Sequence, residues 1–268
     1  MIDRGKQSVL GVRIDAVDYA AVTNRVIDAA RERRPLAVSA LAVHGLMTGV
    51  LDKTHRYRLN AFDLLVPDGQ PVRWALNSLY GAGLRDRVYG PQLMLDVCRH
   101  AADEQLPIYF YGNRADVLGD LCANLRRQLP TLAIAGTQPS KFRSLNAAER
   151  DELVRSIQAS GARIVFVGLG CPRQEVFAYE MRGVLSMPLV AVGAAFNFHA
   201  GRLAQAPAAL QRCGLEWAFR LAVEPRRLWR RYLLLNPMYL GLLALQAAGV
   251  YSIDPNNVQV PSQDVSFG

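Results

Sequence analysis

The sequence at residues 164–175, IVFVGLGCPRQE, joins an apolar run to a turn with two glycines and then to the start of an amphipathic segment. The run at residues 164–167 has the length and composition of a buried strand, and residues 174–185 carry apolar side chains at helical spacing. Gly168 and Gly170 let backbone N–H groups approach a phosphate, which the N-terminus of a helix also favours. The stretch therefore predicts a strand–turn–helix unit.

The same unit recurs nearly to residue 200. The predicted strands are residues 9–14, 36–42, 64–67, 108–111, 132–135, 164–167 and 189–192. The predicted helices are residues 19–33, 45–60, 71–80, 92–104, 115–129, 147–159 and 174–185. This alternation predicts an α/β fold with a Rossmann-like, mostly parallel sheet and helices on both of its faces.

Length, charge and cysteine content limit the class of protein. A chain of 268 residues can bury one large core, or one core and a small appendage. The net charge of +8 predicts an anionic partner, for which nucleic acid, phosphorylated metabolites and anionic lipid all qualify. Four widely spaced cysteines without a CxxC pair are typical of a reduced cytoplasmic protein, and the N-terminal residues have no apolar signal-peptide core.

The alternation of predicted strands and helices does not continue beyond about residue 207. We predict an α/β catalytic core at residues 1–206, a basic and apolar helical appendage at residues 207–252, and a disordered, polar tail at residues 253–268. Residues 202–252 contain seven arginines, no lysine and two glutamates, which places five of the eight net positive charges there.

The appendage has the composition of a membrane-binding element. We expect a helix break at Glu224–Pro225, followed by an arginine-rich helix and an apolar stretch that Asn236–Pro237 divides. Arginines leading into Leu, Trp and Tyr are typical of an interfacial anchor. The alternative is a hydrophobic helix that packs on the core or on a neighbouring subunit.

The segment DLLVPDG at residues 63–69 places the carboxylate of Asp68 between Pro67 and Gly69, directly after a predicted strand. Asp68 can shape a loop or cap the next helix. It can also belong to a ligand site, because ligands of open α/β sheets bind at the carboxyl ends of the strands.

Other polar groups occupy equivalent positions. Arg87 stands before a glycine turn at a predicted helix start, where it can hold a phosphate or remain a solvated charge. Arg173 and Gln174 can donate hydrogen bonds to anions and sugars. Gly193 and Asn197 belong to a small-residue cluster at residues 192–201, which permits close approach to a ligand or close helix packing. All these loops are expected to converge at one edge of the sheet.

His199 and Arg173 in the same loops bear on other possible functions. His199 can act as an acid or base, or as a structural hydrogen-bonding group. Arg173 stands where a dinucleotide fingerprint needs its third glycine, and residues 185–192 offer no acidic ribose ligand. An NAD(P)-dependent oxidoreductase would need both of these features. It is kept as one alternative function, and a non-catalytic membrane adaptor is the other.

The blocks VPDG, RVYG, GLGCPRQE, VGAAFNFHAG, QAP, GLEWAFRL and EPRRLWRRY follow one another over residues 8–250. In this order they resemble the WecG/TagA/CpsF glycosyltransferases. The resemblance implies a peripheral enzyme at the cytoplasmic face of the cell membrane. It implies transfer of a hexose-type sugar, with inversion, from a UDP-sugar to a polyprenyl-diphosphate-linked saccharide in cell-surface or exopolysaccharide assembly.

The resemblance also implies roles for particular residues. Asp68 matches the family's proposed general base, and Arg87 and Gln174 match active-site positions. Ser39 and Leu41 stand where the family usually has Thr-x-Asn, and Gln92 stands where it often has Asp. The predicted catalytic residues are Asp68 and Arg87, and the predicted substrate-binding residues are Ser39, Gly168, Gly170, Arg173, Gln174, Gly193, Asn197, Arg220, Arg227 and Arg231.

This chemistry is consistent with the residues themselves. One carboxylate suffices as a base in an inverting transfer, and arginines with helix N-termini can stabilise departing UDP. Arg220, Arg227 and Arg231 are spaced so that a continuous helix would place them on one face, toward a common diphosphate. Asp63 and Asp68 do not form a DxD-type pair, so we expect no metal site and no cofactor. The expected partners are the UDP-sugar, the lipid-linked acceptor and an anionic membrane surface, without nucleic acid, and a homo-oligomer is possible.

Overall fold

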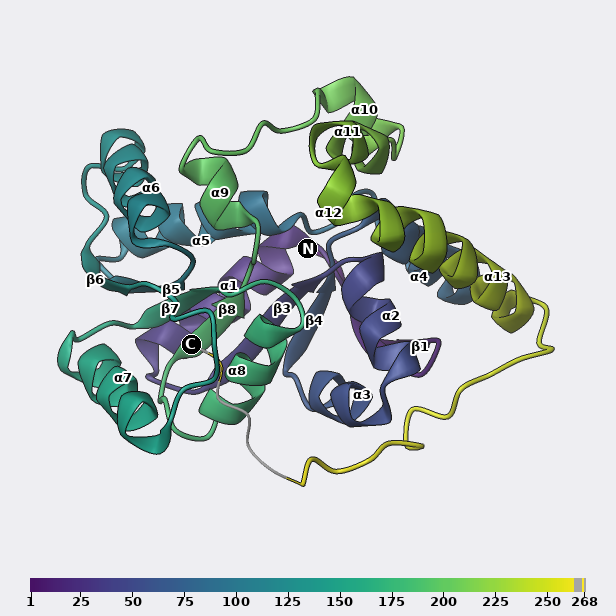
Figure 1. Cartoon of the computed structure of the whole chain (residues 1–268), viewed down its shortest axis with the longest axis horizontal. Helices are drawn as coiled ribbons and strands as arrows, with labels where there is room; N and C mark the ends of the chain where they lie inside the picture. The colour runs from purple at the N-terminus through teal and green to yellow at the C-terminus, as the bar shows by residue number, and fades with distance from the viewer. Residues whose placement is uncertain (263–266, 268) are drawn as a thin grey trace.

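The computed structural model describes residues 1–262 and 267, and only the backbone at residues 208, 212, 227 and 231. Its centre is a six-stranded sheet with the order β4-β3-β8-β7-β5-β6, in which every neighbouring pair is parallel (Figure 1). The strands are β3 (Leu36–Leu41), β4 (Leu64–Pro67), β5 (Ile108–Gly112), β6 (Ile134–Gln138), β7 (Ile164–Gly168) and β8 (Pro188–Ala191). The predicted Rossmann-like α/β fold is confirmed.

Helices cover both faces of this sheet. One face carries α1 (Tyr19–Arg31), α5 (Gly90–Asp103), α6 (Ala115–Gln128) and α9 (Ala195–His199). The other face carries α2 (Val43–Leu51), α3 (Lys53–Asn60), α4 (Gln70–Tyr80), α7 (Ala147–Ala159), α8 (Arg173–Met181) and α13 (Asn236–Ala247).

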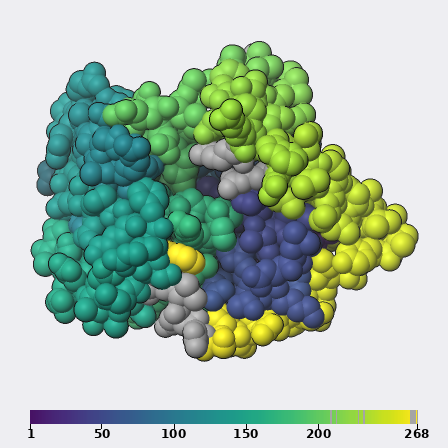
Figure 2. All heavy atoms as spheres, viewed as in Figure 1, coloured from purple at the N-terminus to yellow at the C-terminus, as the bar shows by residue number. Residues whose placement is uncertain are grey.

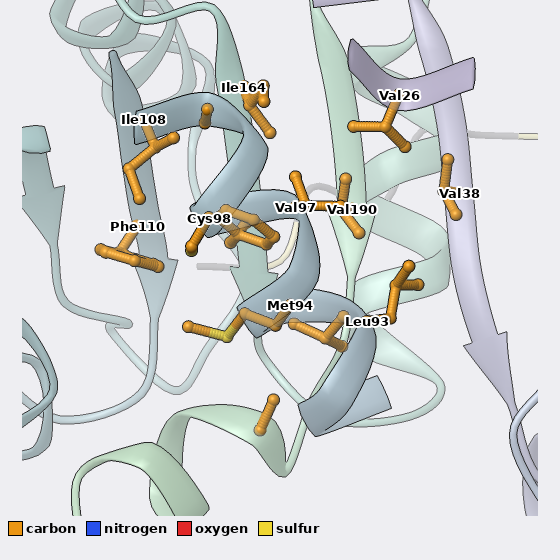
Figure 3. Close-up of a cluster of buried hydrophobic side chains, with 14 of the residues drawn as sticks. Val26, Val38, Leu93, Met94, Val97, Cys98, Ile108, Phe110, Ile164 and Val190 are labelled. Carbon is orange, nitrogen blue, oxygen red and sulfur yellow. The ribbon is translucent and has the colours of Figure 1, made fainter. Parts of the chain in front are cut away.

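Alternate residues of each strand enter different cores, as the two-residue period of a strand requires. Val38 and Val190 pack toward α1 and α5, whereas their neighbours Ala37 and Leu189 pack on the opposite side. Figure 3 shows the first core, in which Val97 of α5 lies among strand side chains. Because both faces are buried, the strands have the continuous apolar sequences that marked them as strands.

The N-terminal residues form a hairpin of β1 (Asp3–Val9) and β2 (Val12–Val17), so the predicted single strand at residues 9–14 is wrong. Leu10 and Gly11 have φ values of 51° and 81°, which are typical of the primed two-residue turns that join hairpin strands. The turn residues Leu10 and Gly11 lack the Asn or Asp that usually precedes the glycine in such a turn. The continuous apolar residues around it therefore had the pattern of one strand.

The single helix predicted at residues 45–60 is also wrong, because Asp52 divides it into α2 and α3. Asp52 has extended backbone angles, and its side chain accepts hydrogen bonds from the N–H groups of Thr54 and His55 at 2.8 and 3.1 Å. A carboxylate that caps a new helix in this way competes with continuation of the old one. A smaller difference concerns β6, which begins two residues later than predicted.

The appendage consists of α10 (Ala208–Arg212), α11 (Glu216–Val223), α12 (Pro225–Arg230), the π-helical turn η1 (Arg231–Leu235) and α13. The break predicted at Glu224–Pro225 is confirmed, since α11 ends at Val223 and α12 begins with the proline. Asn236–Pro237 does not interrupt the helix. It follows η1, and a π turn is a known way to accommodate a proline, which lacks an N–H and clashes with the preceding turn.

The inner side of α13 packs on the core, next to α2 and α4 (Figure 1). Tyr239 is fully buried, and its hydroxyl donates to the carbonyl of Pro71 at 3.0 Å. Gln246 holds the hairpin turn, because its Nε2 donates to the Ser8 carbonyl and its Oε1 accepts from the Leu10 N–H. Within residues 1–262 and 267, no helix has both the length and the hydropathy needed to span a membrane.

Residues 253–262 pass below α2 and α3 along the edge of the molecule (Figures 1 and 2). They form no helix or strand, but Arg56 Nη2 donates to the Asn257 carbonyl at 2.6 Å and Asn60 Nδ2 donates to the Pro255 carbonyl at 3.0 Å. The predicted disordered tail also includes residues 263–266 and 268, which lie outside the described part. The bounds of core, appendage and tail stay a prediction.

Candidate functional site

A cavity of about 750 Å³ lies at the carboxyl ends of the central strands and is called here the main cavity. Residues 40–45, 68–71, 168–175 and 192–194 form its floor, where β3, β4, β7 and β8 end. The appendage forms its roof with Glu216, Trp217, Arg220, Glu224, Leu228 and Tyr232. Figure 2 shows the C-terminal helices in yellow-green beside α2 and α3 in blue.

The main cavity brings together most of the predicted site residues. Those that line it are Asp68, Arg87, Gly168, Gly170, Arg173, Gln174, Gly193, Asn197 and Arg220. Ser39 is buried behind the wall and does not line the cavity. The side chains of Arg227 and Arg231 lie outside the described part of the structure, so their predicted direction stays a prediction.

Asp68 begins the loop after β4 and is half-buried. Its N–H donates to the Leu41 carbonyl at 3.2 Å, and its Oδ1 accepts from the N–H of Gly90 at 3.0 Å. Gly90 is the first residue of α5. By contrast, no side chain caps the N-terminus of α4, the helix that follows Asp68 in sequence. Asp68 therefore holds the start of α5 and not that of the helix that follows it in sequence.

The surroundings of Asp68 favour its protonated form. Burial raises the pKa of the Asp68 carboxyl to about 6, and the nearby carboxylate of Glu216 acts in the same direction, while Arg87 opposes both. A carboxylate with a pKa near 6 is ionised at neutral pH but holds a proton more firmly than an ordinary aspartate. That balance suits a general base.

Arg87 is not a solvated charge. It is 8% exposed and forms a buried ion pair with Glu216, which comes from α11. Its Nη2 also donates to Gln211 Oε1 at 3.3 Å, and its guanidinium lies 4.3 Å from the centre of the Tyr89 ring. These contacts join the appendage to the loop before α5.

Glu216 is a site residue that the sequence alone did not reveal. It is 8% exposed and lines the main cavity beside Arg87. The available signal was an acidic residue between apolar neighbours in a basic region, within the block GLEWAFRL. A glutamate buried in such a place needs a cationic partner, and Arg87 supplies it.

Arg220 is the second cation near Asp68. Its positive charge lowers the pKa of Asp68 against the dominant effect of burial. Its guanidinium lies 5.9 Å from the centre of the Phe198 ring, and its Nε is buried without a hydrogen-bond partner among the described residues. An unpartnered guanidinium nitrogen in a cavity wall can bind a phosphate or a carboxylate.

A buried polar chain leads from the cavity wall at Gln174 and Glu175 to Ser39 behind it. Glu175 Oε1 accepts from Ser39 Oγ at 2.9 Å and from Gln174 Nε2 at 2.8 Å, and burial raises the pKa of Glu175. Gln174 is only 3% exposed and lies in the first turn of α8, at the start of the helix that the sequence predicted. Its Oε1 has no hydrogen-bond partner among the described residues and faces Gly193, where a Cβ atom would lie 2.9 Å away.

Gly168 and His199 have structural roles, whereas Gly170 is available to the ligand site. A Cβ atom at Gly168 would lie 2.5 Å from the Phe196 ring, so this glycine is required for packing against α9. Gly170 has a φ of 77° and open space around its Cα, which leaves its backbone free to approach a ligand. His199 lies outside the main cavity, and its Nε2 bonds the Pro91 carbonyl at 2.8 Å.

Asp63 lies at the opposite end of β4 from Asp68, where its Oδ2 accepts from the Ala37 N–H at 2.7 Å. Among the described residues, His, Cys, Asp and Glu side chains form no cluster of three or more that could hold a metal ion.

The sequence model of the glycosyl transferase WecG/TagA/CpsF family matches residues 7–252. The match includes every residue that lines the main cavity, both in the α/β core and in the appendage. The chain therefore belongs to the WecG/TagA/CpsF family, and it is a glycosyltransferase of cell-surface polysaccharide synthesis.

Proposed function

We propose that this protein transfers a hexose-type sugar from a UDP-sugar to a polyprenyl-diphosphate-linked saccharide, with inversion at the anomeric carbon. Membership in the family implies a sugar-nucleotide donor and a lipid-linked acceptor. The observation that carries the mechanism is the position of Asp68 after β4, in the wall of a cavity that Arg87 and Arg220 also line, where burial raises the pKa of its carboxyl to about 6.

In the proposed reaction, Asp68 accepts the proton of an acceptor hydroxyl while that oxygen attacks the anomeric carbon. The bond from this carbon to the UDP oxygen breaks, and UDP leaves with the bonding electrons. A single displacement of this kind inverts the anomeric carbon. The other two buried carboxylates of the cavity support a one-carboxylate mechanism, because Glu216 pairs with Arg87 and Glu175 bonds Ser39 and Gln174.

The donor diphosphate is best placed near the turn between β7 and α8. Gly170 offers free backbone there, the N-terminus of α8 favours negative charge, and exposed Arg173 stands in its first turn. Arg220 approaches from the roof. Positive groups of this kind stabilise a departing diphosphate without a metal, so we expect transfer to persist in EDTA.

The proposed place of action is the cytoplasmic face of the membrane, with the appendage bound at the interface. The outer side of η1 and α13 exposes large apolar side chains, namely Leu233, Leu234, Met238, Leu240 and Leu245. Exposed Arg226 and Arg230 on α12 lie next to this surface in sequence. Apolar side chains beside arginines bind anionic interfaces, where each cation contributes about 1 kcal/mol.

Transfer itself is tested by incubating the purified protein with a panel of UDP-sugars and synthetic lipid-diphosphate saccharides, with and without EDTA. UDP release together with a glycosylated lipid of inverted configuration supports the proposal. Release of UDP by water alone, or no product from any pair, contradicts it. A product that forms only after added Mg²⁺ or Mn²⁺ contradicts the metal-free step.

Membrane binding is tested separately with Leu234→Glu and Leu240→Glu, at side chains that are 57% and 55% exposed. Both variants should keep the fold and lose binding to anionic vesicles. Val184→Glu, at an exposed position after α8, is the matched control and should bind as the wild type does. If the two leucine variants instead bind vesicles normally and change the mass in solution, the surface is an interface between copies of the chain.

A further inference from the structure

A second cavity of about 450 Å³ adjoins the main cavity. Gln70, Arg87, Tyr89, Pro91 and Gln211 line both cavities, so these residues form the wall between them. The second cavity extends from this wall toward Tyr19 at the start of α1, Gln92 in the first turn of α5, and His199 of α9. Its volume lies within the range of small-molecule sites, roughly 300–1,000 Å³.

The polar groups of the second cavity are mostly uncharged and have hydrogen-bonding capacity to spare. Gln70 is 8% exposed and donates to Asp86 at 3.3 Å, while its buried Oε1 has no hydrogen-bond partner among the described residues. The hydroxyl of Tyr19 accepts from the Tyr89 N–H at 2.8 Å, which leaves its own proton for a ligand.

His199 adds a hydrogen-bond acceptor. Because its Nε2 bonds a backbone carbonyl, that nitrogen carries the proton and Nδ1 is left as an acceptor. Burial also lowers the pKa of His199, which keeps the ring neutral. Amide, hydroxyl and imidazole groups beside the tyrosine rings match a ligand that has many hydroxyls and apolar C–H faces.

The charges of the second cavity are unfavourable for phosphate. Among the described residues of its lining, Arg87 is the cation, and its ion pair with Glu216 compensates that charge. Asp86 adds an exposed carboxylate at the same wall. Among the described lining residues, a phosphate would therefore meet a carboxylate and no free cation, whereas an uncharged saccharide needs no charge compensation.

The position of the second cavity relates it to the acceptor. The donor diphosphate is proposed near β7 and α8, whereas the second cavity lies beyond the wall of Arg87 and Tyr89, beside the start of α5, where the Gly90 N–H donates to Asp68. We propose that the second cavity binds the sugar unit next to the one whose hydroxyl reaches Asp68. The acceptor glycan then has at least two sugar units. This inference rests on the transfer reaction proposed above.

The test measures transfer to acceptors of two lengths by the wild type and by variants at Gln92. Two synthetic lipid-diphosphate acceptors would carry the same terminal sugar, one with a single sugar unit and one with two. Gln92 is exposed, and its Nε2 donates to Asp96 Oδ1 of its own helix at 2.8 Å, so Gln92→Ala and Gln92→Trp should fold normally. Gln158→Ala, at an exposed glutamine of α7, is the matched control.

The wild type and Gln158→Ala should have a KM about tenfold lower for the two-sugar acceptor than for the one-sugar acceptor, which is the effect of one or two good hydrogen bonds. Gln92→Ala should reduce this preference, and Gln92→Trp should abolish it by filling the cavity. Neither should change KM for the UDP-sugar or kcat with the one-sugar acceptor. Equal KM values for both acceptors in the wild type, or a preference that survives Gln92→Trp, would overturn the proposal.

A binding experiment separates failure of this subsite from failure of the proposed reaction. Saturation-transfer NMR with a panel of uncharged disaccharide methyl glycosides requires no turnover. A signal from at least one glycoside that is present in the wild type and lost in Gln92→Trp supports the subsite even if no UDP-sugar is used. No signal from any glycoside, or signals that Gln92→Trp leaves unchanged, would refute the subsite while the transfer assay stands on its own result.

Discussion

Replacing Asp68 by asparagine distinguishes a carboxylate that serves chemistry from one that only holds a loop. Asparagine keeps an Oδ1 atom that can accept the hydrogen bond from Gly90, but it cannot take a proton from an acceptor hydroxyl. If Asp68 is the general base, turnover should fall by roughly 10² to 10⁴. If Asp68 only caps α5, Asp68→Asn should retain turnover, because an asparagine caps almost as well.

The pKa of Asp68 also predicts the change in stability. In the folded chain it is raised from 3.8 to about 6, chiefly by burial, so between these pH values the folded state binds more protons than the unfolded state. Stability therefore falls as pH rises through this window. Above pH 6 the ionised carboxylate costs at most about 3 kcal/mol, less where cavity water screens it. Asp68→Asn removes this cost and should be more stable than the wild type at neutral pH.

The assay is thermal unfolding of both proteins from about pH 4 to pH 8, together with turnover at each pH. A gain of 1–3 kcal/mol corresponds to a Tm higher by roughly 2–10 °C in a chain of this size. The difference should be largest above pH 6 and should vanish near pH 4, where both side chains are uncharged. Turnover within a few-fold of the wild type would refute the assignment of Asp68 as the base, and a variant that is less stable at pH 8 would refute the raised pKa.

Three further predictions concern the neighbours of Asp68. The pH profile of kcat/KM should fall on the acid side with an apparent pKa near 6, because the base must be ionised, and a profile flat down to pH 5 would contradict this. Glu216→Gln should shift that acid limb to lower pH, since the Glu216 charge raises the pKa of Asp68, and an unchanged limb would show that the two groups are not coupled. Gln174→Ala should cost about 1–3 kcal/mol, because it removes a buried hydrogen bond to Glu175, and chemical denaturation with no loss would show that water replaces the amide.

The sequence predicted the sheet because its strands are buried on both faces. Residues such as Val38 and Ala37 are apolar although they point to opposite cores, and that continuous apolarity is what marks a parallel strand. The hairpin turn at Leu10–Gly11 was missed because apolar residues continue through it. The division at Asp52 was available as an N-cap signal, but helical spacing continues across it and favoured one long helix.

The sequence could predict those residues of the candidate site that come directly after a strand. Asp68 and Gly170 stand after strands, and parallel strands bring such positions to one edge. Sequence could not pair Arg87 with Glu216, because these residues are far apart in the chain and meet only when the appendage folds back. The burial of Gln174 depends in the same way on Gly193, a neighbour in space and not in sequence.

The roof of the main cavity and the apolar outer surface both belong to the appendage, which the helix break at Glu224–Pro225 divides. Glu216 and Arg220 of α11 face Asp68 and Arg87, while Leu234 and Leu240 are exposed further along the same segment. Tyr239 and Gln246 fix the inner side of α13 to the core. If the outer side meets a membrane as proposed, a lipid-linked acceptor reaches the cavity at the roof, where Arg220 Nε has no hydrogen-bond partner in the described part of the chain. In this proposal the appendage holds the protein at the lipid surface, and its Arg220 adds positive charge near the departing diphosphate of the donor.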